Sequence, residues 1–185
     1  MRKLTKNVLG FLMAAVFCCM ALVAPASAAA SPALSNASCQ SVHQSMYDLS
    51  QKASFASKVG KLRPVSSTSE RWAGWYRYGD FVTVFLEPNS AGKLKTMMFV
   101  VNYGPNKQYA KAAELQTREA VTIAYYTLGM KKAEMDKLWD SFVTTWSGKA
   151  WCSQMGCNFI MYVPAQTFEK LEKENLLIFE LSATN

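Results

Sequence analysis

The stretch that decides the fold is Arg71–Tyr103, which reads RWAGWYRYGDFVTVFLEPNSAGKLKTMMFVVNY. It contains three runs rich in aromatic and β-branched residues, 71–78, 81–86 and 94–103, and turn residues separate them. Gly79-Asp80 is a two-residue link of the kind that closes tight hairpins, and residues 88–92 form a second turn. The sequence therefore predicts a three-stranded antiparallel meander.

Helices and further strands flank this meander. Apolar residues at helical spacing predict helices over 41–59, 107–128 and 132–146, with Gly60, Gly129 and Gly148 placed as terminators. Strands are expected over 149–152, 158–163 and 176–181, with a short helix in 164–174. This order predicts an α+β fold: an antiparallel sheet, made of the meander plus C-terminal strands, with the N-terminal helix and the central helix pair packed on one face.

The N-terminus has the layout of a secretory signal peptide. A basic start (Arg2, Lys3 and Lys6) precedes an apolar run over 8–24, and Ala26-Ser27-Ala28 fits the signal peptidase pattern. Pro25 argues against the alternative, a membrane anchor. We predict a cleavable signal peptide over 1–28, a flexible leader over 29–38 and a single domain over 39–185, periplasmic or secreted from a bacterial envelope.

Charge narrows the choice of partners. Removing Arg2, Lys3 and Lys6 lowers the formal net charge from +7 to +4, and the remaining basic residues are scattered. A nucleic-acid interface needs a clustered basic face, so nucleic acid is not expected as a partner. No other apolar run approaches spanning length, so stable membrane insertion after cleavage is not expected either.

Three cysteines follow the predicted cleavage site. In an exported protein, Cys152 and Cys157 are expected to form a disulfide across a four-residue hairpin loop, leaving Cys39 over. The alternative is a metal site. His43 with the three cysteines would form a zinc set, and Met155 would instead suit Cu(I).

Catalytic motifs are not visible in the sequence. His43 is the single histidine, and neither a nucleophile turn nor a glycine-rich phosphate loop is present. The carboxylates fall mostly on predicted helix faces, as on a solvated surface. We therefore expect no catalytic, cofactor-binding or metal-binding residues, and a binding protein is favoured over an enzyme.

Aromatic and arginine residues gather in the first strand of the meander. Alternation places Trp75 on the face opposite Trp72, Tyr76 and Tyr78, so one of the two sets enters the core and the other meets solvent or a partner. The alternative is that the aromatic residues serve only the core. The candidates for a binding surface are Arg71, Trp75, Arg77, Gln154 and Met155.

The segment Cys152–Val163, a Cys-x₄-Cys loop joined to a strand, is similar to the periplasmic inhibitors of vertebrate-type lysozyme. That family has a histidine between the cysteines, where this chain has Ser-Gln-Met-Gly. We expect a non-enzymatic envelope binding module, of the inhibitor or immunity type, that acts on another exported protein or on an envelope component. The alternative is a small-ligand-binding protein or an enzyme with a cleft between the sheet and the helix pair.

The signal peptide leads to a direct prediction. Protein purified from the periplasm or the culture medium should have an intact mass that corresponds to a chain starting at Ala29, within about two residues. A full-length chain in the membrane fraction would contradict it.

Overall fold

The computed structural model describes residues 32–65 and 71–184, and the predicted signal peptide lies outside them. The helices of the described residues are α2 (Cys39–Lys52), α3 (Lys107–Thr127), α4 (Lys132–Thr145) and α5 (Phe168–Glu174), the last preceded by a 3₁₀ turn over Ala165–Thr167. The strands are β1 (Gly74–Tyr78), β2 (Val82–Pro88), β3 (Leu94–Asn102), β4 (Ser147–Cys152), β5 (Cys157–Tyr162) and β6 (Leu176–Thr184). None of these helices combines the length and the apolar character that crossing a membrane requires.

The six strands form one antiparallel sheet in the order β1-β2-β3-β6-β5-β4. The predicted meander is confirmed as β1, β2 and β3, and the β4–β5 hairpin forms the other side of the sheet. The last strand, β6, lies between them and pairs with β3 on one side and with β5 on the other. The sheet therefore joins two hairpin systems through its final strand.

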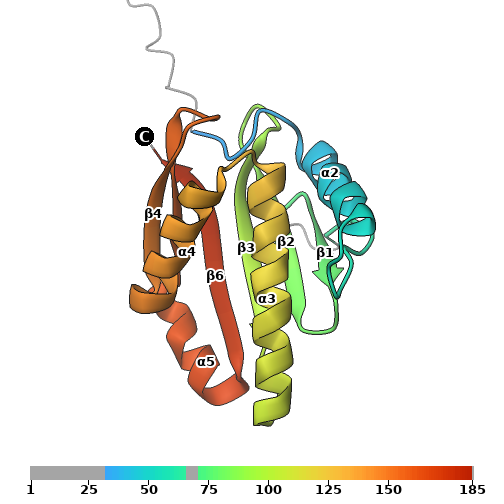
Figure 1. Cartoon of the computed structure of the whole chain (residues 1–185), viewed down its shortest axis with the longest axis vertical. Coiled ribbons are helices and arrows are strands. Elements are labelled where there is room, and N and C mark those ends of the chain that lie inside the picture. Colours follow the sequence, from blue (N-terminus) through green and yellow to red (C-terminus); the bar gives the residue numbers. More distant parts are fainter. Residues whose placement is uncertain (1–31, 66–70, 185) are drawn as a thin grey trace, which may run out of the picture. The chain divides into compact units, whose positions relative to one another are not determined.

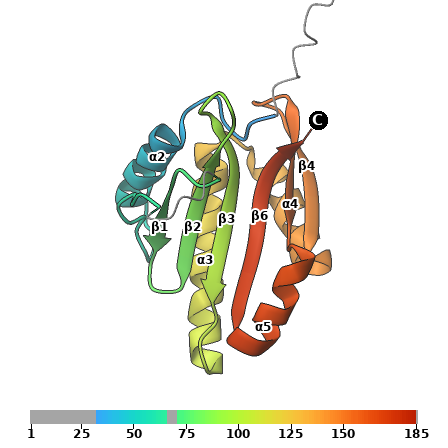
Figure 2. The same cartoon turned by 180° about the vertical axis from the view of Figure 1, so that it is seen from behind.

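Helices α3 and α4 lie in front of the sheet in Figure 1, and the view from behind shows the strands uncovered by them (Figure 2). Helix α2 is on the same side, because the Tyr76 hydroxyl, which faces the helices, donates to Met46 Sδ at 3.5 Å. The predicted α+β fold, with helices on one face of an antiparallel sheet, is confirmed. We call the opposite side the open face.

The core lies between the helices and the sheet. At its centre the rings of Phe99 on β3 and Phe179 on β6 are stacked, with centroids 4.8 Å apart. Phe142 of α4 packs against Phe179 with ring centroids 5.0 Å apart, and this contact holds α4 against β6. Burying aromatic side chains of this size supplies a large share of the favourable free energy of folding.

Helix α2 ends at Lys52, seven residues before the predicted end at Val59. The Lys58 ammonium donates to the carbonyls of Ser50 and Ala53 at 2.8 and 3.1 Å, so it caps the last turn in place of a glycine. The chain then follows the outer edge of β1, where Val59 bridges to Tyr78 and Arg63 to Trp75. Gly60 therefore serves this edge and is not a helix cap.

Part of the predicted flexible leader is packed. Leu34 is fully buried, the Ser35 N–H donates to the Leu94 carbonyl at 3.3 Å, and the Leu94 N–H donates to the Ala37 carbonyl at 3.0 Å. These contacts and the Ser38–Lys93 bridge hold the segment beside β3, although its small residues predicted a flexible leader.

Gly148 has a role other than the predicted helix terminator. Helix α4 ends at Thr145, and Gly148 lies inside β4. A Cβ atom at Gly148 would lie 2.4 Å from the Leu138 carbonyl oxygen, because the helix backbone approaches the strand this closely. The missing side chain therefore sets the distance between α4 and β4.

We predict that Gly148→Ala lowers the free energy of unfolding by about 2 kcal/mol, because the helix backbone must move to admit the methyl group. For a domain of this size the midpoint of thermal denaturation should fall by about 4–8 °C. Lys149→Ala, at the exposed neighbouring position, serves as the control and should leave the midpoint nearly unchanged. Equal effects of the two substitutions would contradict the close approach.

Candidate functional site

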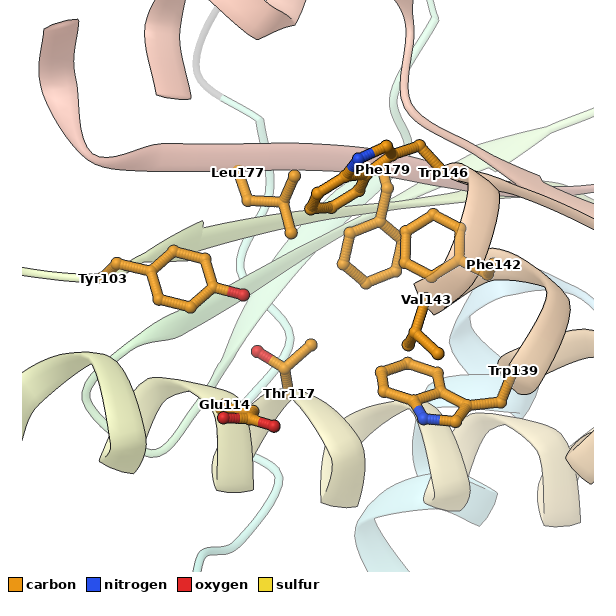
Figure 3. Close-up of a pocket in the computed structure, with 9 residues that line it drawn as sticks. All are labelled: Tyr103, Glu114, Thr117, Trp139, Phe142, Val143, Trp146, Leu177 and Phe179. Carbon is orange, nitrogen blue, oxygen red and sulfur yellow. The ribbon is translucent and has the colours of Figure 1, made fainter. Parts of the chain in front are cut away.

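A pocket of about 160 Å³ lies between α3, α4 and the central strand β6 (Figure 3). Its size is similar to that of an engineered apolar cavity that binds benzene, about 150 Å³. It lies between the sheet and the helix pair, where the alternative prediction placed a cleft. Most of its walls are aromatic or aliphatic, and the lining residues are Tyr103, Glu114, Thr117, Trp139, Phe142, Val143, Trp146, Leu177 and Phe179.

The floor and one wall of the pocket come from the regular alternation of their elements. Leu177 and Phe179 are two residues apart on β6, so both point to the helix side of the sheet, and both are buried. Trp139, Phe142 and Val143 follow one another at steps of three and one on α4, so they form one broad face. Trp139 is half-buried: it packs against the core and also lines the pocket.

Trp146 holds an unusual backbone position at the pocket mouth. It caps α4 with φ 58° and ψ 17°, the left-handed region that favours glycine, at a cost of about 1–2 kcal/mol for other residues. Its indole packs edge-on against Phe142 of α4 and Phe168 of α5, with centroids 6.2 and 6.3 Å away. Non-glycine residues held in this backbone region cluster at active sites and ligand-binding sites.

The polar groups of the pocket gather at the end opposite Trp139 and Val143. Figure 3 shows the Tyr103 hydroxyl, the Glu114 carboxylate and the Thr117 hydroxyl at this end. Burial, and then the nearby Glu114 carboxylate, raise the pKa of the Tyr103 hydroxyl, so it remains protonated at neutral pH. The Thr117 hydroxyl donates to the Ala113 carbonyl at 2.7 Å, which leaves its oxygen lone pairs free to accept.

Arg71, predicted as a surface contact, is engaged in an ion network on the open face. Its guanidinium donates to both oxygens of Glu180 at 2.9 and 3.0 Å and to Glu87 at 3.3 Å. Lys95 also donates to Glu87, and the Tyr162 hydroxyl donates to Glu180 at 2.9 Å. Burial and the Glu180 contact raise the pKa of Tyr162 to about 12. Both buried carboxylates are thus neutralised, and the network ties the chain before β1 to β2 and β6.

Trp75 and Arg77 also lie on the open face, as their alternation with the buried Tyr76 and Tyr78 requires. Trp75 is half-buried, its ring centre lies 6.4 Å from that of Phe85, and the Arg63 guanidinium lies over the indole at 5.2 Å. Arg77 is exposed. The separation of Trp75 from the core-facing tyrosines follows the predicted alternation. The prediction was wrong for Trp72, which was expected on the side of the tyrosines: it precedes β1, and its ring lies 5.9 Å from Phe85 on the open face.

The other two surface candidates, Gln154 and Met155, lie elsewhere. They belong to the turn between β4 and β5, and β4 is at the opposite edge of the sheet from β1. Met155 packs partly against the core, and the Gln154 side chain covers Gly129. The structure therefore does not bring the five candidates into one surface.

The predicted Cys152–Cys157 disulfide is not seen in the structure, where Cys39, Cys152 and Cys157 are free and buried thiols. Cys152 and Cys157 are nevertheless direct partners across the hairpin. Burial, and then Cys152, raise the pKa of the Cys157 thiol, which disfavours the thiolate that starts disulfide exchange. Within residues 32–65 and 71–184 no three His, Cys, Asp or Glu side chains form a metal-binding group, so the proposed Cys₃His set is not assembled.

The sequence alone does not identify Tyr103, Glu114 and Leu177 as site residues, because they come from three separate parts of the chain. One signal was present: the helix 132–146 carries more large apolar residues than a single core stripe needs. Val143 and Trp146 are the surplus, and they are 51% and 42% exposed.

In comparisons with known proteins, no family model, no curated protein and no solved structure matches the chain.

Proposed function

We propose that this chain is a non-enzymatic binding protein of the bacterial envelope that holds a small, mostly apolar ligand in the pocket between α3, α4 and β6. The observation that carries the proposal is the composition of the pocket, in which five of the nine lining residues are aromatic. Small-molecule sites have this character: mostly apolar walls with a few polar groups that orient the ligand.

The exposed rim supports the same conclusion. Val143 and Trp146 present large apolar side chains to solvent beside a buried apolar floor. Covering such surface is favourable by about 25 cal/mol per Å², so a ligand that fills the pocket gains from the floor and the rim together. The left-handed backbone of Trp146 adds a second argument, because the chain keeps a tryptophan where glycine would relieve strain.

A substitution at this residue separates binding from stability. Trp146→Gly relieves the left-handed strain while removing the indole from the pocket mouth, so the midpoint of thermal denaturation should change little. Affinity for a neutral aromatic probe, phenethyl alcohol, should fall about fivefold or more, measured by isothermal titration calorimetry. Trp151→Ala removes a tryptophan that is similarly exposed but does not line the pocket, and it should bind the probe as the unmodified protein does. Absence of saturable binding to the unmodified protein would overturn the proposal.

A second candidate function is capture of another exported protein through the open face. Its support is the row of half-buried apolar side chains there, with Trp75 beside Phe85 and, one strand further, Met98. Aromatic side chains beside arginines are frequent hot spots of protein interfaces, and Arg77 is exposed on the same strand. This surface would serve an inhibitor or immunity-type role independently of the pocket.

The open face is tested by pairing two aromatic truncations. Trp75→Ala should lower the free energy of unfolding by only about 1 kcal/mol and weaken the capture of envelope proteins, measured by pull-down and mass spectrometry. Phe159→Ala, at a fully buried position, should cost about 3–5 kcal/mol and serves as the core reference. If both variants lose the same thermal stability, Trp75 belongs to the core and the second candidate fails.

A further inference from the structure

We propose that the pocket ligand is an organic cation: an ammonium group on an apolar, aromatic-sized body, with the ammonium at the Glu114 and Tyr103 end. This inference rests on the proposed ligand-binding function and names the chemical class of the ligand.

The charge of the pocket is one-sided. Glu114 is the charged residue among those that line it, and neither lysine nor arginine takes part in the lining. The ion pairs of the described residues do not include Glu114, so its carboxylate is not neutralised within that part of the chain. Arg118, one turn further along α3, lines a separate pocket with Asp136. An anionic ligand would therefore meet repulsion here, and a cation would meet attraction.

The aromatic walls favour the same charge. Tyr103, Trp139 and Trp146 approach the pocket from three directions (Figure 3). The faces of tryptophan and tyrosine rings carry negative electrostatic potential, and they bind ammonium groups within about 6 Å of the ring centre. Tyr103 is the aromatic ring at the Glu114 end, so its face and the carboxylate are the groups that would attract the ammonium, while Trp139 and Trp146 would enclose the apolar body of the ligand.

The hydrogen-bonding capacity at the polar end matches an ammonium donor. The Glu114 carboxylate accepts only, and the Thr117 oxygen retains acceptor capacity because its hydrogen is given to the Ala113 carbonyl. The Tyr103 oxygen can also accept. The N–H groups of a primary ammonium thus find acceptors there, while the ring of the ligand fills the apolar end formed by Phe142, Val143 and Phe179.

The test compares probes of the same shape and different charge. Phenethylamine, phenethyl alcohol and phenylacetate present a cation, a neutral group and an anion on one phenyl ring. Isothermal titration calorimetry at low salt should show phenethylamine binding about tenfold tighter than phenethyl alcohol, and phenylacetate binding more weakly than both. The preference for the amine should shrink as salt is added, because Glu114 is at the surface.

Two matched variants assign the preference to Glu114. Glu114→Gln should lower the amine preference about threefold and leave the affinity for the alcohol unchanged. Asp140→Asn removes the same charge from an exposed site on α4 that does not line the pocket, and it should keep the full preference. Both substitutions are at exposed helix positions, and equal melting curves will confirm that folding is intact.

The outcomes separate the two levels of the proposal. Equal affinity for amine and alcohol, or an unchanged preference in Glu114→Gln, overturns the cation assignment while the pocket remains a ligand site. Failure of all three probes to bind overturns the proposed function itself.

Discussion

The pairing of β6 with β3 and β5 is the interaction on which the rest of the structure depends. Without it the meander and the β4–β5 hairpin share no ladder of hydrogen bonds. The stacked rings of Phe99 and Phe179 lie at this junction, and Phe142 brings α4 onto it. Because α3, α4, β4 and β5 lie between β3 and β6 in the chain, the contacts of β3 with β6 join residues far apart in sequence. Closing them costs chain entropy, which the completed core offsets.

The same strand makes the pocket possible. α3 and α4 straddle β6, and Leu177 and Phe179 between them form an apolar floor. The distance of α4 from the sheet is set on its far side, where Gly148 lets the helix backbone approach β4. The left-handed turn at Trp146 then carries the chain from α4 into β4 and places an indole over the opening. The shape of the pocket thus depends on the close approach of α4 to β4 at Gly148 and on the Trp146 indole at the end of α4.

Most of the local structure could be predicted from the sequence, because turn residues and apolar periodicity act over a few neighbours. The meander and the two central helices came from such signals, and the separation of Trp75 from Tyr76 and Tyr78 followed from alternation. The site could not be predicted in the same way. Its residues are assembled by the insertion of β6, which no local pattern encodes. The surface candidates Trp75, on β1, and Gln154, next to β4, proved to lie at opposite edges of that sheet. The role of Arg71 escaped prediction because its partner Glu180 is 109 residues away.

The two edges of the sheet differ in whether another segment of the chain pairs with them. The outer edge of β1 is occupied by Val59 and Arg63, whereas within the described residues no segment pairs with the outer edge of β4. Of these two edges, only that of β4 is therefore open to the addition of a strand from another chain. Lys149 points out from that strand, and a lysine on an edge opposes such addition because stacking it against a neighbouring chain brings like charges together. Protection of the sheet against the addition of a further strand therefore depends on β4, the same short strand that the α4 backbone approaches at Gly148.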